Sequence, residues 1–498
     1  MEKRSLKNRT VGMQKVVREQ VKGTSAKGCP VSKLCGGCEY AGRPYNQQLK
    51  LKEKRVKELL SQICEVRPIV GAEDPLYYRN KVHWAFGHIG THLIAGRYAE
   101  GSHKIIENDD CLLEDQECAK ILSDIRAMTG QFKILSYDEK SRRGLLRRVL
   151  VRKGVATGEI MVVLVLTSPV LPGKKAFIKK LLEKNPSITT VLINVNTRTD
   201  SMILGEKTIN EYGRGYIWDE LLGVRFKISA ESFYQINHDQ TEKLYSLAIE
   251  AASLKAGDKV LDAYCGIGTI GLCAASSCKD IRLTGVEMNP ASVADARANA
   301  KSNGLSKARF IAADATSYMI EASSRKESFD VVFLDPPRSG TTPEFIEACE
   351  KLSPERIVYV SCDPTTLARD LLEFKKHGYT PMYSTPVDMF PFTEHVETCV
   401  LLSKLSRAPK LEVTVKMSEL DITEAEAKAS YQEIQDYVME NTGLHVSNLN
   451  IAQVKRKYGI LERQNYNLPK TDGARQPQCT PEKERAIVDA FRHYKMID

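Results

Sequence analysis

From Val260 to about Leu402, short apolar runs alternate with longer segments in which apolar residues recur at helical spacing. The apolar runs have the length of buried strands. They are VLDAYCG, LTGVEMN, ARFIAADA, FDVVFLDPPR, RIVYVSCDP and VETCVLLSK. Strands that alternate with helices in this way form doubly wound, mostly parallel sheets. We therefore expect an α/β fold with a Rossmann-like sheet.

The chain before this region has a different pattern. Between about Leu76 and Ile228, β-type runs are short and interrupted by glycine. Residues 148–154 and 158–166 predict one hairpin, and residues 191–195 and 201–204 predict another. We expect a separate β-rich region here.

The two ends of the chain differ again. Residues 1–28 carry eight Lys and Arg against two Glu and show no apolar periodicity, as in a mobile basic arm. Helical spacing recurs in residues 45–63 and in three segments near the C-terminus. The expected domains are a basic arm over 1–28, a cysteine-bearing β-rich region over 29–228, an α/β domain over 229–406 and a helical extension over 407–498.

Composition narrows the class of protein. The longest apolar stretch, Ile160–Leu166, is far shorter than the ~20 residues of a membrane span. Thirteen cysteines without a signal peptide indicate a reducing compartment, where thiols act as ligands or nucleophiles. A net charge of +9 suits a polyanionic partner. We expect a cytoplasmic, monomeric enzyme with no membrane association.

The first apolar run leads into a glycine turn, in which Gly266, Gly268 and Gly271 form a G-x-G-x-x-G pattern. Dinucleotide and S-adenosylmethionine folds share this pattern. Glu287 ends the next strand, where an acid can accept both ribose hydroxyls. Asp314 follows the third strand and can accept from an adenine amino group. We therefore expect a nucleoside-binding site.

Two further strand ends carry reactive groups. Asp335 lies in D-P-P-R, where two prolines fix the chain and Arg338 follows. The next strand ends at Cys362, and a helix that starts near Thr365 would favour a thiolate through its dipole. Amino-group methyltransferases also have an aspartate-proline-proline signature, but an aromatic residue normally occupies the position of Arg338.

Methylation of uracil at C5 explains the need for a thiol. C5 is a weak nucleophile, and thiolate addition at C6 creates an enolate whose C5 can attack a sulfonium methyl group. A base must then remove the C5 proton before the thiol leaves. Glu397 is the candidate base, with Glu394 and His395 as alternatives.

The chain closely resembles the RNA uracil-C5 methyltransferases over roughly residues 29–404. The motifs that carry the resemblance are Ser232–Asn237, Leu261–Gly268, Leu334–Arg338, Ser361–Pro364 and His395–Glu397. The resemblance implies that Cys362 is the nucleophile, that Glu397 is the base and that S-adenosylmethionine is the methyl donor. It also implies cofactor contacts at Gln235, Tyr264, Thr269, Glu287, Asp314 and Asp335. By the same resemblance Phe233 lies near a flipped target base. Thr269 and Cys399 depart from the residues usual in the family, asparagine and valine.

A second cluster of cysteines lies near the N-terminus. Cys29, Cys35 and Cys38 fall on one loop, and Cys-Gly-Gly-Cys allows the chain to fold tightly around a metal. Zinc sites more often pair two C-x-x-C knuckles, while three clustered cysteines with a distant fourth also suit a 4Fe-4S cluster. The resemblance assigns the fourth ligand to Cys111 rather than Cys118 and favours iron-sulfur over zinc. It also favours 23S ribosomal RNA as the substrate, because transfer-RNA members generally lack the cluster.

Basic residues indicate where RNA binds. Four arginines at 142, 143, 147 and 148 precede a hairpin, and we expect phosphate contacts there. Ribosomal members commonly begin with a β-barrel RNA-binding module, which the 28 residues before Cys29 cannot hold. We expect the extension after residue 406 to supply RNA affinity through basic helices, including Lys455, Arg456 and Lys457.

The sequence leaves three alternative functions. Transfer RNA could be the substrate instead of ribosomal RNA. An RNA cytosine-C5 methyltransferase would carry a cysteine directly after its aspartate-proline motif, where this chain has Pro337-Arg338. A non-catalytic RNA-binding protein would not need Cys362, Glu397 and the cofactor acids together.

Overall fold

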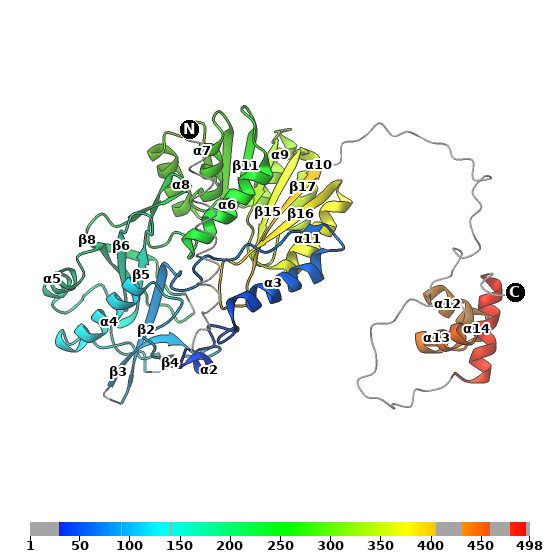
Figure 1. Cartoon of the computed structure of the whole chain (residues 1–498), viewed down its shortest axis with the longest axis horizontal. Helices are drawn as coiled ribbons and strands as arrows, with labels where there is room; N and C mark the ends of the chain where they lie inside the picture. Colours follow the sequence, from blue (N-terminus) through cyan, green and yellow to red (C-terminus); the bar gives the residue numbers. More distant parts are fainter. Residues whose placement is uncertain are drawn as a thin grey trace, which may run out of the picture. The chain divides into compact units, whose positions relative to one another are not determined.

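The computed structural model describes residues 29–90, 92–139, 141–200, 202–404, 431–458 and 479–494 (Figure 1). The expected basic arm over 1–28 lies outside these residues. The chain divides into two compact units, Met1–Ser406 and Arg407–Asp498.

An eight-stranded sheet organises the C-terminal half of the first unit. Its order is β1-β16-β17-β15-β14-β11-β12-β13. The strands are β1 (Glu65–Val66), β11 (Lys259–Ala263), β12 (Arg282–Glu287), β13 (Arg309–Ala312), β14 (Val331–Leu334), β15 (Arg356–Ser361), β16 (Tyr379–Val387) and β17 (Glu397–Lys404). Strands β11 to β15 pair in parallel, and β17 runs antiparallel to β15 and β16. The predicted alternation of strands and helices is confirmed.

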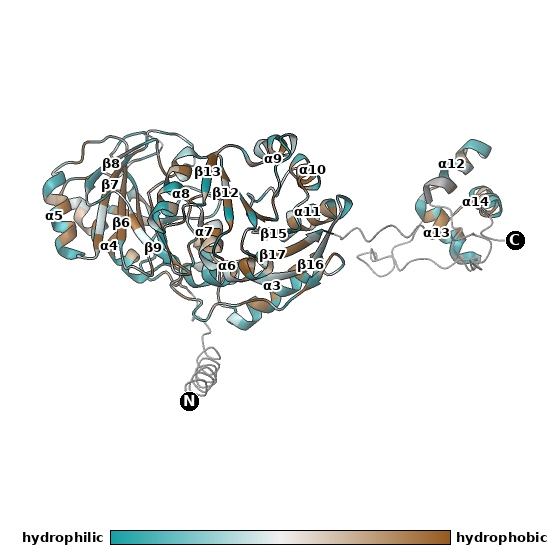
Figure 2. Cartoon of the chain, turned by 90° about the horizontal axis from the view of Figure 1, so that it is seen from above, coloured by the Kyte–Doolittle hydropathy of each residue, from teal (hydrophilic) through white to brown (hydrophobic). Residues whose placement is uncertain are grey.

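Helices cover both faces of this sheet (Figure 2). Successive strand residues face opposite sides, so Val260 packs in one core and Leu261 in the other. One face packs against α6 (His238–Ala252), α7 (Thr269–Ser277) and α8 (Pro290–Ser302). The other packs against α3 (Tyr45–Leu60), α9 (Ala315–Ser324), α10 (Pro343–Leu352) and α11 (Pro364–Lys376). The carboxyl ends of the parallel strands therefore share one edge, where ligands bind in such sheets.

The preceding region contains a second sheet of order β4-β3-β2-β5-β6-β7-β8. Its strands are β2 (Lys81–Ile89), β3 (His92–Tyr98), β4 (Ile105–Ile106), β5 (Leu146–Lys153), β6 (Ile160–Leu166), β7 (Ile188–Val195) and β8 (Lys207–Tyr212). Helices α4 (Gln116–Gln131) and α5 (Lys174–Lys184) cover one face. A short helix α2 (Ser32–Cys35) precedes this sheet, and a hairpin of β9 (Ile217–Leu221) and β10 (Val224–Ile228) follows it.

One predicted hairpin is confirmed and the other is shifted. Strands β5 and β6 pair antiparallel as expected. The strand expected at residues 201–204 is wrong, because the partner of β7 begins only at Lys207. The Asn194 amide holds Gly205 through its carbonyl at 2.9 Å and its N–H at 2.7 Å. These bonds form a turn where the sequence suggested a strand.

The second unit contains α12 (Tyr431–Thr442), α13 (Asn448–Lys457) and α14 (Pro481–His493) around a small apolar core. The expected basic surface of α13 is reduced. Lys455 is buried, and Lys457 pairs with Glu484 at 2.5 Å. No helix in the described ranges of either unit has the length and apolar character of a membrane span.

Candidate active site

Three predicted residues meet at the carboxyl edge of the large sheet. Asp335 directly follows β14, and Cys362 directly follows the neighbouring strand β15. Strand β17 runs the opposite way and starts at Glu397, so its first residue lies at the same edge. Ser361 pairs with Thr398, which makes Cys362 and Glu397 the next two residues in register. A thiol and a carboxylate thus converge from adjacent strands.

Burial raises the pKa of two carboxyl groups at this edge. Glu397 is only 4% exposed, and burial followed by the neighbouring Asp335 raises its pKa to about 8. Burial also raises the pKa of Asp335 to about 7. A carboxyl group with a pKa near neutrality is suited to accept a proton.

The surroundings of Cys362 disfavour its thiolate. Burial, with Glu397 and Asp335 nearby, raises its pKa to about 11, while Arg338 acts in the opposite direction. The expectation that the α11 dipole favours a thiolate stays a prediction, and burial opposes it. Asp363 caps that helix by accepting from Thr365 N–H at 2.8 Å, so a carboxylate already occupies the helix N-terminus.

Arg338 and Phe233 both project outward. Arg338 is exposed, and its Nη2 lies 3.4 Å from His395 Nε2. Phe233 is 69% exposed although it follows a buried serine and precedes a buried tyrosine. An exposed aromatic ring is available for stacking on a base.

The glycine turn leaves room for a ligand. Gly266 and Gly268 both have positive φ, +56° and +84°. No atom lies within 4 Å of a Cβ placed on Gly266, so that side of the turn is open. The Glu287 carboxylate accepts from Gly266 N–H at 3.2 Å and from Asn289 N–H at 2.8 Å. These bonds hold the acid at the end of β12, and the geometry fits a nucleoside with ribose hydroxyls.

Three other expected cofactor contacts come from the ends of β13 and β11 and from the loop before α6. Asp314 caps α9 through Ser317 N–H at 2.8 Å, which engages one of its carboxylate oxygens. Tyr264 has a positive φ of 67° and stacks on Phe345 with ring centroids 6.0 Å apart. Gln235 is 8% exposed in the loop before α6.

Sequence reasoning missed two supporting residues. Asp262 is buried within β11 and accepts from Gly271 N–H at 2.9 Å, and burial raises its pKa to about 7. The Tyr245 hydroxyl lies 3.0 Å from Thr269 Oγ1. Both buried residues stabilise the turn and the helix that follows it. A buried aspartate inside a strand is itself an uncommon signal.

The N-terminal cysteines lie near one another. The Asn108 amide donates to Cys29 Sγ at 3.4 Å, three residues before Cys111. Burial raises the pKa of Cys38 to about 12, with Cys111 and Cys35 raising it further and Arg79 and Arg97 lowering it. Across the described ranges, no group of three or more His, Cys, Asp or Glu side chains has metal-binding geometry.

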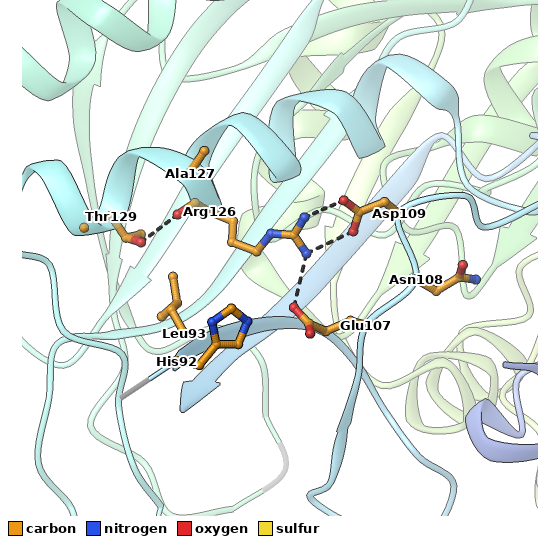
Figure 3. Close-up of a pocket in the computed structure, with 9 residues that line it drawn as sticks. His92, Leu93, Glu107, Asn108, Asp109, Arg126, Ala127 and Thr129 are labelled. Carbon is orange, nitrogen blue, oxygen red and sulfur yellow. Dashed lines mark hydrogen bonds and ion pairs between the residues drawn. The ribbon is translucent and has the colours of Figure 1, made fainter. Parts of the chain in front are cut away.

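Cys118 and a cavity beside Asn108 both lie close to Cys111 in the sequence. Cys118 is fully buried in the core beneath α4. A cavity of about 610 Å³ lies next to the Asn108 segment (Figure 3). Its Arg126 guanidinium binds Asp109 at 2.9 Å and Glu107 at 3.3 Å. Its lining residues all belong to β3, α4 and the segment between them, so this cavity is not part of the edge that carries Cys362 and Glu397.

Known proteins are similar to this chain in sequence and in fold. The family model for tRNA (uracil-5-)-methyltransferase matches residues 44–405. A protein from Halalkalibacterium halodurans described as an uncharacterized RNA methyltransferase is 40% identical over 379 residues, 75% of this chain and 82% of the relative. One from Caldanaerobacter subterraneus with the same description is 39% identical over 381 residues, 76% and 84% of the two chains.

A solved structure extends the comparison. The Pyrococcus abyssi tRNA (uracil-54, C5)-methyltransferase in complex with S-adenosyl-L-homocysteine matches with a TM-score of 0.61 and 28% identity. The match covers 74% of this chain and 86% of that structure. The chain therefore belongs to the family of S-adenosylmethionine-dependent RNA uracil-C5 methyltransferases.

Proposed function

We propose that this enzyme methylates C5 of a uridine in 23S ribosomal RNA through a covalent Cys362 adduct, with Glu397 as the base. The observation that carries the mechanism is the register of β15 and β17, which makes Cys362 and Glu397 neighbours at the carboxyl edge. Asp335 lies beside them.

The steps assign one task to each side chain. Cys362 gives its proton to solvent, with Arg338 as the nearby cation that favours the thiolate. The sulfur then adds to C6 of uracil, and the electron pair of the C5=C6 bond moves toward O4 to form the enolate. C5 then attacks the methyl carbon that S-adenosylmethionine supplies on its sulfonium, and S-adenosylhomocysteine leaves. Glu397 removes the C5 proton, the C5=C6 double bond re-forms and the Cys362 sulfur departs. We assign Gln235, Tyr264, Gly266, Gly268, Thr269, Glu287, Asp314 and Asp335 to the cofactor site, with Phe233 and Arg338 on the side of the RNA.

Strands β2 and β5 of the seven-stranded sheet carry the basic residues of the proposed phosphate-binding surface. Lys81 and His83 are half-buried on one face of β2, and Arg148 lies on β5 beside them. Within the described part of the chain, the Lys81 and His83 side chains have no hydrogen-bond or ion-pair partner. Burial and neighbouring cations lower the pKa of Lys81 to about 7 and of His83 to about 3. Backbone phosphates of RNA would supply the missing negative charge.

The arginine-rich segment contributes less than expected to such a surface. Arg142 and Arg143 are exposed, but Arg147 is buried. Its guanidinium binds Glu139 at 2.9 Å and the Arg198 carbonyl at 2.7 Å. Two of the four arginines therefore stay fully open to solvent for phosphate contact.

The substrate class can be tested directly. Mass spectrometry of 23S ribosomal and transfer RNA from a deletion strain should show loss of one or more 5-methyluridines in 23S RNA only. Loss in transfer RNA instead would support the alternative suggested by the family model and the Pyrococcus abyssi structure.

We further propose that Cys29, Cys35, Cys38 and Cys111 hold a 4Fe-4S cluster, with zinc as the alternative metal. None of the four thiols is in a disulfide, and the guanidiniums of Arg79 and Arg97 lie near Cys38, where they oppose the rise in pKa that burial causes. Thiolate donors with nearby cations suit an anionic iron-sulfur centre. When bound, the cluster would fix the loop and could exchange an electron.

Replacement of Cys111 by alanine should remove the cluster, whereas Cys118→Ala should keep it. Anaerobically purified wild-type protein should be brown, with about four irons per chain. Iron analysis and visible absorption measure both variants. Zinc in the wild-type protein, or bleaching by Cys118→Ala alone, would contradict the assignment.

A further inference from the structure

The segment Asp388–Val396 connects β16 to β17 and delivers Glu397 to the catalytic edge. Two side chains of α3 hold it. Lys52 Nζ donates to Asp388 Oδ1 at 2.5 Å and to the Phe390 carbonyl at 3.0 Å. Gln48 Oε1 accepts from Phe392 N–H at 2.8 Å. Residues 336 positions apart in the chain thus meet beside the active site.

Both α3 residues that hold the segment are buried. Gln48 and Lys52 are each 0% exposed, and Asp388 is also 0% exposed. Their spacing of four residues brings them onto the same face of the helix. A buried ion pair is often no more stabilising than apolar side chains of similar volume. Polar residues at these two positions therefore indicate control of the segment's conformation rather than stability alone.

The cysteine-bearing segment binds the same residues from another side. Tyr40 N–H donates to the Phe392 carbonyl at 3.0 Å, and Glu39 Oε2 accepts from Glu394 N–H at 3.3 Å. Glu39 directly follows Cys38. Gln48 thus binds the N–H of Phe392, and Tyr40 binds its carbonyl.

Phe392 needs this support because its backbone is strained. Its φ is +67°, in the left-handed region that non-glycine residues seldom occupy. Such a conformation persists only where surrounding contacts impose it. Loss of the Gln48 or Lys52 contact would therefore let the segment relax and move Glu397.

We infer that Gln48 and Lys52 are positioning residues for the reaction, which fix the Asp388–Val396 segment so that Glu397 reaches the C5 proton. The inference rests on the proposed role of Glu397. Proton removal follows methyl transfer, so displacement of Glu397 slows only the late step. The methylated covalent intermediate should then accumulate, while cofactor and RNA still bind.

The test compares Gln48→Leu and Lys52→Met with Gln47→Leu and Lys54→Met, which change exposed residues of the same helix. The substrate is total RNA from a strain that lacks the enzyme, with a radiolabelled cofactor methyl group. The buried-site variants should lose ~10- to 100-fold in kcat, as small misplacements of catalytic groups do. KM for RNA and Kd for cofactor should change less than about threefold. Labelled protein–RNA adduct should persist on denaturing gels.

Hydrogen exchange supplies a readout independent of turnover. The peptide that contains Phe392 should exchange faster in Gln48→Leu and Lys52→Met than in the controls. Gln48→Glu keeps an acceptor oxygen for Phe392 N–H but loses the donor that Gln48 Nε2 offers to the Arg43 carbonyl at 2.8 Å, so it should restore exchange and kcat only in part.

Three outcomes separate this inference from the proposed mechanism. Wild-type kcat and wild-type exchange in Gln48→Leu would overturn the inference. Lys52→Met leaves Asp388 without its ion-pair partner, and if that variant fails to fold, Gln48→Leu still gives the test because it removes no charge. Lost turnover without adduct in Gln48→Leu, when Glu397→Gln does trap one, would also overturn it. Absence of adduct in Glu397→Gln would instead refute the role of Glu397, and exchange at Phe392 would still decide whether α3 holds the segment.

Discussion

Cys362→Ala should abolish methylation and every covalent RNA complex, because the proposed mechanism begins with addition of the thiol. Without the thiol no sulfur adds to C6, and C5 of uracil is too weakly nucleophilic to attack a sulfonium methyl group. Removal of a nucleophile lowers turnover by a factor on the order of 10⁴ or more. The measurement is transfer of a labelled methyl group to RNA, with gel analysis for protein–RNA adducts. Cofactor affinity should be unchanged.

Cys399→Val is the matched control. Cys399 is a second buried thiol near this edge, paired in register with Val360 two residues before Cys362. Valine is similar in volume, and such replacements usually cost little stability. The control should keep wild-type activity. Activity in Cys362→Ala, or its loss in Cys399→Val with the fold intact, would show that the reacting thiol is misassigned.

The sequence predicted the catalytic edge because strand ends have local signals. Asp335 and Cys362 each follow a run of apolar residues with the length typical of a buried strand, and prolines follow both. Parallel strands then force the two side chains to the same edge. The position of Glu397 could not be predicted from strand order in this way. Its strand runs antiparallel, and only the register with β15 brings it beside Cys362.

Strand β16 escaped prediction for a local reason. Pro381 and Pro386 interrupt it, and proline is rare within sheets because it cannot donate to the ladder. The structure tolerates Pro381 at a register shift against β17. The segment that follows β16 leads to Glu397. Because β16 was not predicted, the contacts between α3 and this segment were not predicted either.

The burial of polar residues on helices was also not predicted from the sequence. Gln48 and Lys52 lie among charged neighbours, and nothing local distinguishes them from exposed residues such as Gln47 and Lys54. Lys455 belongs to a basic run, yet it is buried in the second unit. Burial of a polar side chain depends on partners distant in sequence, which local periodicity does not reveal.

Glu397→Gln should stop the reaction after methyl transfer and trap a methylated RNA–protein adduct. The amide cannot accept the C5 proton, but thiol addition and methyl transfer do not require this group as a base. Turnover should fall by ~10²- to 10⁴-fold, the usual range for loss of a general base. The adduct should survive denaturing electrophoresis and retain label from the cofactor methyl group.

The pH dependence and two neighbouring variants complete this test. Burial raises the pKa of Glu397 to about 8, so the acid predominates below that pH and the carboxylate above it. Release of methylated RNA by the wild-type enzyme should therefore speed up as pH rises through this range, whereas Glu397→Gln should show no such rise. Glu394→Gln and His395→Asn change the same segment and should still turn over. If folded Glu397→Gln binds cofactor and yields no adduct, while one of these neighbours does trap it, the proton acceptor is that neighbour.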